Sequence, residues 1–401
     1  MLDYKLLSAD CHVVEHPDAF ARVQKEYPDR APRVVQDPQG QAPGLWFLVE
    51  GLEPMHVGYF ALGHVIDKPE GRMNIAMYQN ETSFKKSVND FVEGYRYEDF
   101  KEDWEADAYL KALDKDNVEA CIIYASWARY NYTQDDPKFQ RSILNSYNEW
   151  MFETFAAHPS KRMFPAPMIS ILDVDLAVKD MKYYVKKGAK TLHIPTTILD
   201  SGYYEKKYEP LWATAVELDV PLSVHANASQ GRPMKLHGTK KRDFAPEKFI
   251  INSRGAGLGG PSTAWEFISN LMFSGVWDRY PSLKVGVAEF KMDDAAHTFE
   301  MLDYEMGRLS TYDPERNTYK RLPSEYLKDN VFISFEESRA IALTSPLYGA
   351  DNYMWGSDFP HYQSVWPYSS TLVEKACEGL DAATIRKLAR ENVNKVYHLV
   401  D

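Results

Sequence analysis

From about residue 104 onward, short apolar runs alternate with longer segments in which apolar residues recur every three or four positions. This alternation is typical of strands and amphipathic helices that follow one another, and such strands pair in parallel through right-handed crossovers. With a first strand near the N-terminus there are eight, predicted at residues 4–7, 118–124, 162–170, 189–195, 221–225, 283–290, 331–335 and 353–357. Eight such units predict an α/β fold, a (β/α)8 TIM barrel whose chemistry lies at the carboxyl ends of the strands.

One long stretch does not fit this alternation. Residues 14–45 are rich in Pro, Asp, Gln and Gly, and two short strands are expected at 46–49 and 55–59. We interpret residues 13–103 as a long insertion after strand 1 that caps the barrel mouth and includes a small β-hairpin; a partly mobile surface segment is the alternative. Because no change of composition marks a second domain, residues 1–401 are expected to form a single barrel domain.

Charge and cysteine content narrow the function classes. The net charge of −12 and the absence of a Lys/Arg-rich run argue against nucleic acid or an anionic membrane as partner. The net charge says little about a site for a small-molecule substrate, which is the partner we expect. The cysteines Cys11, Cys121 and Cys377 are far apart and odd in number, which predicts neither a disulfide framework nor a CxxC zinc cluster. With no signal-peptide pattern and no apolar run of about 18 residues, we expect a cytoplasmic protein.

Polar residues gather where the predicted strands end. Asp10 and His12 lie two residues apart at the end of the first strand, where an extended backbone projects their side chains to the same side while Cys11 points away. The other strand-end candidates are His193, His225, Glu289, Asp358 and His361. A barrel brings all of these positions to one mouth, where unpaired buried carboxylates and imidazoles are costly. A divalent metal ion would supply the missing charge partner.

Candidate substrate-binding residues lie close to these strand ends. Arg232, His237 and Arg254 occupy the long connection after residue 225, and any of them could anchor a substrate carboxylate. Exposed loop charges are the alternative explanation for these three residues. His361, which follows Asp358 by three residues, is a further candidate for contact with substrate.

Several segments together resemble a known family. They are Asp10-Cys11-His12, the run from Leu218 to His225, the run from Ser274 to Glu289, the run from Tyr326 to Phe335, Met354-Trp-Gly-Ser-Asp-Phe-Pro-His361, and the run from Glu391 to Tyr397. These resemble the amidohydrolase superfamily, in the amidohydrolase-related branch that includes aminocarboxymuconate-semialdehyde decarboxylase. The resemblance implies that Asp10, His12, His225 and Asp358 hold one catalytic divalent ion, zinc in the first place, with manganese or iron as alternatives. It also implies a homodimer.

The chain departs from those decarboxylases at the end of strand 6, where they usually carry a histidine and this chain carries Glu289. Glu289 could ligate the metal, act as general base or form a salt bridge with Lys291. If both His193 and Glu289 ligate, a second metal ion becomes possible.

The departure at Glu289 favours a metal-dependent hydrolase of a small aromatic or unsaturated carbonyl compound. In such an enzyme Asp358 would accept the proton of a metal-bound water that attacks an amide, ester, thioester or activated C–C bond. The alternative enzyme is a metal-dependent, non-oxidative decarboxylase of an aromatic or enol carboxylate, because the same ligands serve both reactions. A barrel that only binds or assembles would lack the metal ligands, all four of which are present.

Overall fold

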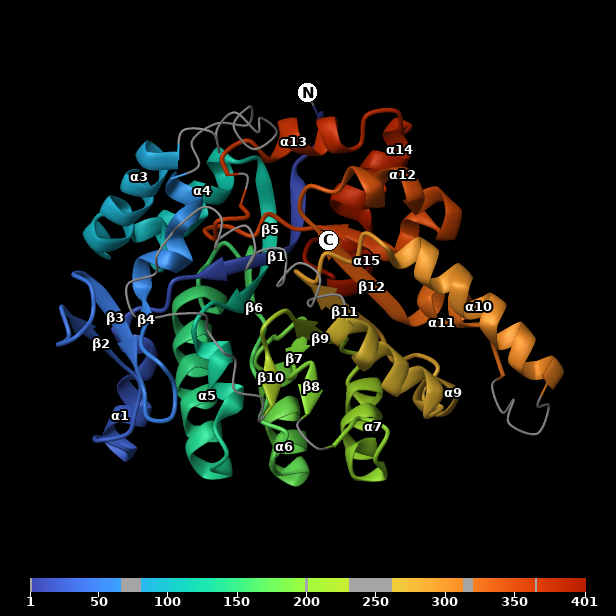
Figure 1. The fold of residues 1–401 in the computed structure, drawn as a ribbon, viewed down its shortest axis with the longest axis horizontal. Coiled ribbons are helices and arrows are strands. Elements are labelled where there is room, and N and C mark those ends of the chain that lie inside the picture. Colours follow the sequence, from blue (N-terminus) through green and yellow to red (C-terminus); the bar gives the residue numbers. More distant parts are fainter. Residues whose placement is uncertain (1, 66–80, 199–200, 231–261, 313–319, 365) are drawn as a thin grey trace.

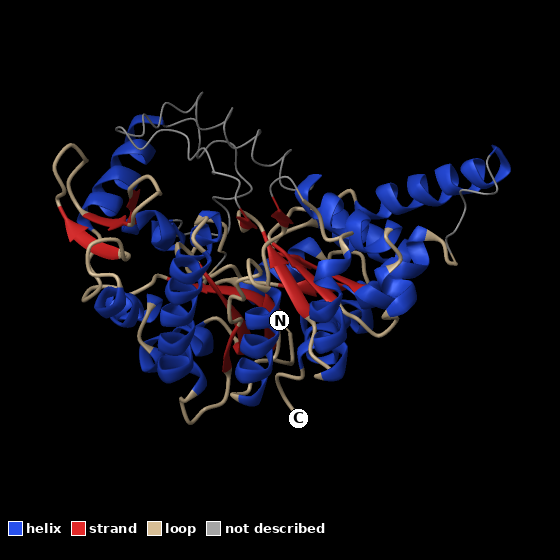
Figure 2. Cartoon of the chain, turned by 90° about the horizontal axis from the view of Figure 1, so that it is seen from below, coloured by secondary structure: helices blue, strands red, loops and turns tan. Residues whose placement is uncertain are grey.

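The structure is a computed structural model, and it describes residues 2–65, 81–198, 201–230, 262–312, 320–364 and 366–401 (Figure 1). Each of the eight predicted strands overlaps an observed one. They are β1 (Leu6–Val13), β5 (Val118–Ala125), β6 (Met163–Pro165), β7 (Leu192–His193), β9 (Leu222–His225), β11 (Val285–Ala288), β12 (Val331–Phe335) and β13 (Tyr353–Trp355). The strands lie at the centre and helices surround them (Figure 2), so the fold is the predicted (β/α)8 arrangement.

The eight strands pair in parallel within two sheets, in the orders β1-β5-β6 and β13-β12-β11-β9-β7. Backbone hydrogen bonds join the sheets at one seam, where His193 N donates to the Pro167 carbonyl at 2.9 Å. At the other seam His12 N donates to the Phe359 carbonyl at 2.7 Å, and Asp358 N to the Asp10 carbonyl at 2.9 Å. In the described residues these bonds, rather than one continuous ladder, connect the two sheets around the barrel.

Strand lengths differ from the prediction for reasons visible in the residues. β1 continues to Val13 because it stays paired with β5, so Asp10 and His12 lie within the strand. β6 ends at Pro165, and Pro167 follows; prolines lack the N–H that a strand donates to its neighbour. Where β13 ends, a Cβ on Gly356 would lie 2.7 Å from the Cβ of Asp10, so only glycine allows this close approach to β1.

Helices cover the outside of the strands. They are α4 (Ala106–Lys115), α5 (Pro137–Met151), α6 (Val174–Lys186), α7 (Glu209–Glu217), a helix over 262–273, α9 (Val276–Arg279), α10 (Ala295–Tyr312), α11 (Pro323–Asn330), α12 (Arg339–Tyr348), α13 (Ser369–Ala376), α14 (Ala382–Arg386) and α15 (Asn392–Tyr397). α5 shows why they begin where they do: the Asp136 carboxylate accepts from the N–H groups of Lys138 and Phe139, and Pro137 takes the first turn. Near the C-terminus, α14 and α15 are separated by a π-helical turn at Lys387–Glu391.

The described part of the segment between β1 and α4 holds α1 (Ala21–Glu26), α3 (Glu81–Gly94) and an antiparallel sheet. That sheet has the order β2-β3-β4, formed by Arg33–Gln36, Leu45–Leu48 and Met55–His56. The 3-10 segment Val57–Val65 then reaches the loop after β13, where Gly63 N donates to the Pro360 carbonyl at 2.9 Å. This segment therefore contacts the loop that carries Asp358 and His361. No helix in the described ranges is both long and apolar enough to cross a membrane.

Candidate metal centre

Six of the polar side chains singled out in the sequence meet at the carboxyl ends of the strands. Their donor atoms form two overlapping groups in which every ligand atom lies within 4.8 Å of the others. One group is Asp10, His12 and His225; the other is His12, Glu289, Asp358 and His361. All of these side chains are buried or nearly so. They meet because parallel strands of a barrel direct their carboxyl ends to one mouth.

His12 lies at the centre of the cluster. Its Nε2 atom is 3.1 Å from His225 Nε2, 3.2 Å from Asp358 Oδ1 and 3.4 Å from Asp10 Oδ1. His225 Nε2 also lies 3.6 Å from Asp10 Oδ1. Two imidazole nitrogens and two carboxylate oxygens thus converge on one small volume from β1, β9 and the loop after β13.

These four residues have the chemistry of a divalent-metal site. Both carboxylate oxygens of Asp10 and of Asp358 are buried without a hydrogen-bond donor among the described residues. His225 Nδ1 lies 2.9 Å from the Ala226 carbonyl, which can only accept, so the proton is on Nδ1 and the Nε2 lone pair faces the cluster. Unsatisfied buried carboxylates beside imidazole nitrogens are the ligands that a divalent ion such as zinc or manganese binds.

The local electrostatics keep the two aspartates ionised. Burial opposes ionisation of Asp10, yet the neighbouring His225 and His12 outweigh it and lower its pKa to about 2. Burial likewise opposes ionisation of Asp358, and His361 with His12 lowers its pKa well below the usual range. Asp10 and Asp358 in turn outweigh burial at His12 and raise its pKa to about 10. The centre therefore presents carboxylates in the form that binds a cation.

Glu289 directly follows β11 and borders the same cluster. Its Oε2 lies 3.4 Å from His225 Nε2, and its Oε1 accepts a hydrogen bond from Gln363 Nε2. Burial, followed by the nearby Asp358 carboxylate, raises the pKa of Glu289 to about 7. Its backbone has a φ of +61°, in the left-handed region that non-glycine residues seldom adopt and that is often found at functional sites. The salt bridge considered between Glu289 and Lys291 is not formed, since Lys291 Nζ contacts Glu336.

His193 ends β7 but belongs to neither donor group of the described residues. Its ring is 6.2 Å from that of His225, centroid to centroid, and contacts the rings of Tyr124 and Tyr132 at 5.6 and 5.5 Å. Neither ring nitrogen has a described hydrogen-bond partner. Burial, and then the neighbouring His225, lowers the pKa of His193 well below its usual value. His193 is therefore a neutral imidazole near His225 and outside both donor groups.

His361 extends the cluster toward β5. Its ring stacks on that of His12 with centroids 3.7 Å apart, and its Nδ1 lies 3.3 Å from Asp358 Oδ1. Its Nε2 is 2.6 Å from the hydroxyl of Ser126, the residue that follows β5. Burial and the adjacent His12 lower the pKa of His361 to about 3.

The structure also brings to the site residues that the sequence interpretation did not include. Arg129 lies in the 3-10 helix Ala128–Thr133 that follows β5, with its Nη2 atom 3.9 Å from Glu289 Oε2. Ser126 and Arg129 come one and four residues after that strand, so the rule applied to the other strand ends would have found them. The proposed substrate anchors Arg232, His237 and Arg254 lie outside the described residues.

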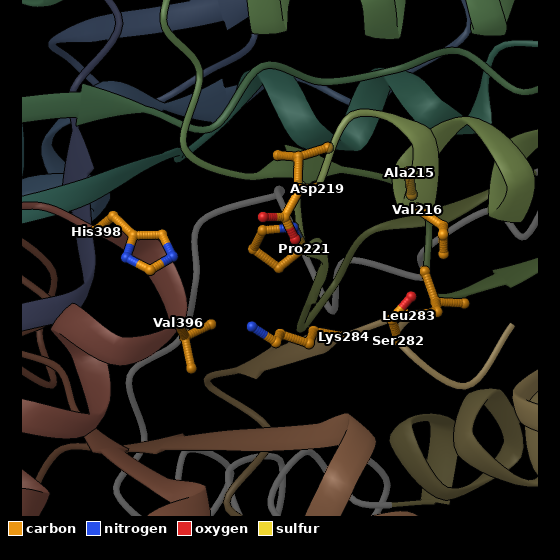
Figure 3. A pocket seen from close by; sticks show the side chains of 10 residues that line it. Ala215, Val216, Asp219, Pro221, Ser282, Leu283, Lys284, Val396 and His398 are labelled. Atoms are coloured by element: carbon orange, nitrogen blue, oxygen red, sulfur yellow. The ribbon is translucent and has the colours of Figure 1, made fainter.

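A pocket also exists at the opposite end of the barrel (Figure 3). It lies at the amino-terminal ends of β9 and β11, and its charged or titratable lining residues are Asp219, Lys284 and His398. It contains none of the donor cluster. Because active sites of such barrels lie at the carboxyl ends of the strands, the donor cluster and not this pocket is the candidate site.

With this geometry established, comparison with known proteins gives the family. The sequence profile of the family described as Amidohydrolase matches residues 63–399. The chain belongs to the amidohydrolase family. Gamma-resorcylate decarboxylase of Rhodococcus jostii is 24% identical over 314 residues, which cover 72% of this chain and 84% of that protein. Decarboxylase orsB of Emericella nidulans is 32% identical over 218 residues, 51% of this chain and 56% of that protein.

Crystal structures of family members share the fold. An amidohydrolase of Mycobacterium avium subsp. paratuberculosis superposes with a TM-score of 0.73 at 18% identity, covering 100% of this chain and 99% of that chain. The 5-carboxyvanillate decarboxylase of Novosphingobium aromaticivorans, complexed with manganese and 4-hydroxy-3-methoxy-5-nitrobenzoic acid, gives 0.62 at 17% identity, covering 99% and 96%. These structures show the TIM-barrel fold, and the family match together with the decarboxylase relatives shows that the chain is an enzyme.

The comparisons also correct one prediction. The hydrolase interpretation is wrong, because the relatives that match across most of the chain are decarboxylases. That interpretation depends on Glu289 standing where decarboxylases usually have histidine. The metal ligands serve both reactions, so one exchanged residue outside them does not decide which bond is cleaved.

Proposed function

We propose that this amidohydrolase-family enzyme is a metal-dependent, non-oxidative decarboxylase of a hydroxylated aromatic carboxylate. The observation that carries the proposal is the match to gamma-resorcylate decarboxylases over 72% of this chain and 84% of theirs. The donor cluster supports it, since the side chains of Asp10, His12, His225 and Asp358 suit a divalent cation.

These four residues would hold a single divalent ion. The manganese in the related 5-carboxyvanillate decarboxylase makes Mn²⁺ the first ion to test, with Zn²⁺ second. When bound, the ion would supply positive charge that offsets the negative charge of the substrate's carboxylate and ring oxygen. His225 would be kept in the right tautomer by the Ala226 carbonyl, as ligating histidines commonly are.

Decarboxylation breaks the bond between the ring carbon and the carboxylate carbon. The electron pair stays on the ring carbon, which takes up a proton, and CO₂ leaves. The chain must therefore supply one proton. Three carboxyl groups belong to the cluster. Asp10 and Asp358 are held as anions beside histidines, so we assign proton delivery to Glu289 Oε2.

The test uses the full chain loaded in turn with Mn²⁺ and Zn²⁺. Incubation with 2,6-dihydroxybenzoate and with 5-carboxyvanillate in D₂O should release CO₂ and place one deuteron on the vacated ring carbon. Absence of CO₂ from both acids with either ion would overturn the proposal. Protein from which the ion has been removed by a chelator is the control, and it should be inactive until the ion is returned.

A further inference from the structure

We propose that Arg129 binds the carboxylate of the substrate and makes the site select for it. This inference rests on the proposed function for the class of substrate. Arg129 is not among the residues that the sequence motifs single out. The argument comes from its burial, its hydrogen bonds and its distance to the donor cluster.

The guanidinium of Arg129 is buried but poorly satisfied. Only 3% of the side chain is exposed. Nη1 donates to the Ala125 carbonyl at 2.6 Å, whereas Nε is buried with no hydrogen-bond partner among the described residues. Leaving a donor of a buried charged group unpaired is destabilising, so the Nε of Arg129 is a candidate to bind a ligand.

The neighbouring carboxylates do not accept a hydrogen bond from Nε of Arg129. Glu289 Oε2 lies 3.9 Å from Nη2, which is too long for a hydrogen bond. Glu15, another buried carboxylate nearby, accepts instead from the backbone N–H groups of Trp127 and Ala128, at 3.1 and 2.8 Å. These carboxylates balance the charge of Arg129 over some distance and leave its Nε without an acceptor.

The position of Arg129 points to the group that it binds. Its Nη2 and the Nε2 of His225 approach the same oxygen of Glu289, at 3.9 and 3.4 Å, so the guanidinium lies beside the donor cluster. The Nε and Nη2 atoms form one planar edge of a guanidinium, and that edge matches the two oxygens of a carboxylate. A carboxylate bound there would lie next to the proton that we assign to Glu289.

A purely structural role for Arg129 makes a different prediction. If the guanidinium only balances the charge of Glu289, its removal should weaken every ligand alike, together with stability or metal content. If it binds the substrate carboxylate, its removal should weaken ligands that carry a carboxylate and spare those that lack one. A pair of ligands that differ by this group separates the two roles.

The experiment measures binding of 2,6-dihydroxybenzoate and of resorcinol, the same ring without the carboxylate, by calorimetry at 4 °C in short titrations. The protein is the metal-loaded full chain as wild type, Arg129→Met, Arg129→Lys and the control Arg30→Met. Arg30 is an arginine whose partners, Glu50 and Asp136, are at the surface. Metal content and thermal midpoint are recorded for every variant.

We expect Arg129→Met to weaken 2,6-dihydroxybenzoate by about 30- to 100-fold, the range of a charge-assisted bidentate contact, while resorcinol changes less than about threefold. Arg129→Lys keeps the charge but loses the planar edge, so it should lose about tenfold for the acid alone. Arg30→Met should match wild type. Equal weakening of both ligands, no change for either, or no binding of the acid by wild type would overturn the proposal.

The test of Arg129 and the test of decarboxylation can fail independently of each other. If wild type releases no CO₂ but its preference for the acid disappears in Arg129→Met, the decarboxylase proposal fails and the role of Arg129 stands. If Arg129→Met decarboxylates with an unchanged KM, the role of Arg129 fails and the decarboxylase proposal stands. If Arg129→Met does not fold or hold metal, the Arg129→Lys pair of titrations decides.

Discussion

The aspartates Asp10 and Asp358 at one end of the barrel and Asn352 at the other differ in whether their buried polar atoms have hydrogen-bond partners. At the carboxyl ends of the strands, the oxygens of Asp10 and Asp358 are buried without hydrogen-bond donors among the described residues. At the amino-terminal ends, Asn352 donates through Nδ2 to the carbonyls of Leu327, Lys328 and Val331, at 2.9, 3.0 and 2.9 Å. Satisfied groups stabilise a fold, whereas unsatisfied ones lower stability and are kept for binding. The comparison contrasts a cluster suited to binding a cation with a side chain that joins the end of α11 to the starts of β12 and β13.

The largest expected effect is at the metal centre. His225→Ala removes a donor that nothing else replaces, so we expect loss of the bound ion and a fall in turnover of at least about a thousandfold. Metal analysis and CO₂ release measure this. His297→Ala, on the exposed face of α10, is the control and should keep both. Full activity in His225→Ala would remove His225 from the site.

The substitution Glu289→Gln tests whether Glu289 delivers the proton at the carboxyl ends of the strands. The amide keeps the shape of the carboxyl group but cannot deliver a proton, so we expect kcat to fall about 10²- to 10⁴-fold with the ion still bound. Steady-state CO₂ release and metal content measure the two effects separately. Glu217→Gln, whose carboxylate pairs with Lys182 at the surface, is the matched control. An unchanged kcat would show that the proton comes from another group.

At the opposite end the effect should be on stability alone. Asn352→Ala removes a buried donor that three carbonyls share, which we expect to lower the free energy of unfolding by about 2–4 kcal/mol. Denaturant unfolding at a constant metal concentration measures it, and activity below the transition should stay within about twofold of wild type. Loss of activity without loss of stability would show that Asn352 affects catalysis, contrary to the difference we infer between the two ends of the barrel.

The smallest effect is a pH dependence, also at the amino-terminal ends of the strands. Asp116, two residues before β5, accepts from Ser369 N at 2.9 Å, and burial raises its pKa from 3.8 to about 7. A raised carboxyl pKa means that the folded state binds the proton more tightly, so this contribution is lost as pH rises from about 4 to 7.

We therefore expect the stability of wild type relative to Asp116→Asn to fall by about 1–3 kcal/mol between pH 4.5 and 7.5. Parallel denaturant titrations of the two proteins at both pH values measure it. A difference that stays constant with pH, or that grows, would contradict the raised pKa.

Much of the fold could be predicted because its signals are local. Strands and helices are marked by apolar periodicity and caps, so all eight strands were placed and α5 begins at its capping Asp136. The same rule brought Asp10, His12, His225 and Asp358 to one mouth. The points at which helices begin and end were less predictable. The apolar pattern, for example, does not indicate the π-helical turn that separates α14 from α15.

The sequence by itself determined the alternation of strands and helices and the residue types at the strand ends, because both are properties of short segments. Only the tertiary structure decided which side chains lack partners. Residue order does not show that Lys291 contacts Glu336, that His193 lies outside the donor groups, or that Nε of Arg129 has no described acceptor. Such facts depend on atoms contributed by several strands and loops at once, and burial makes their satisfaction energetically decisive.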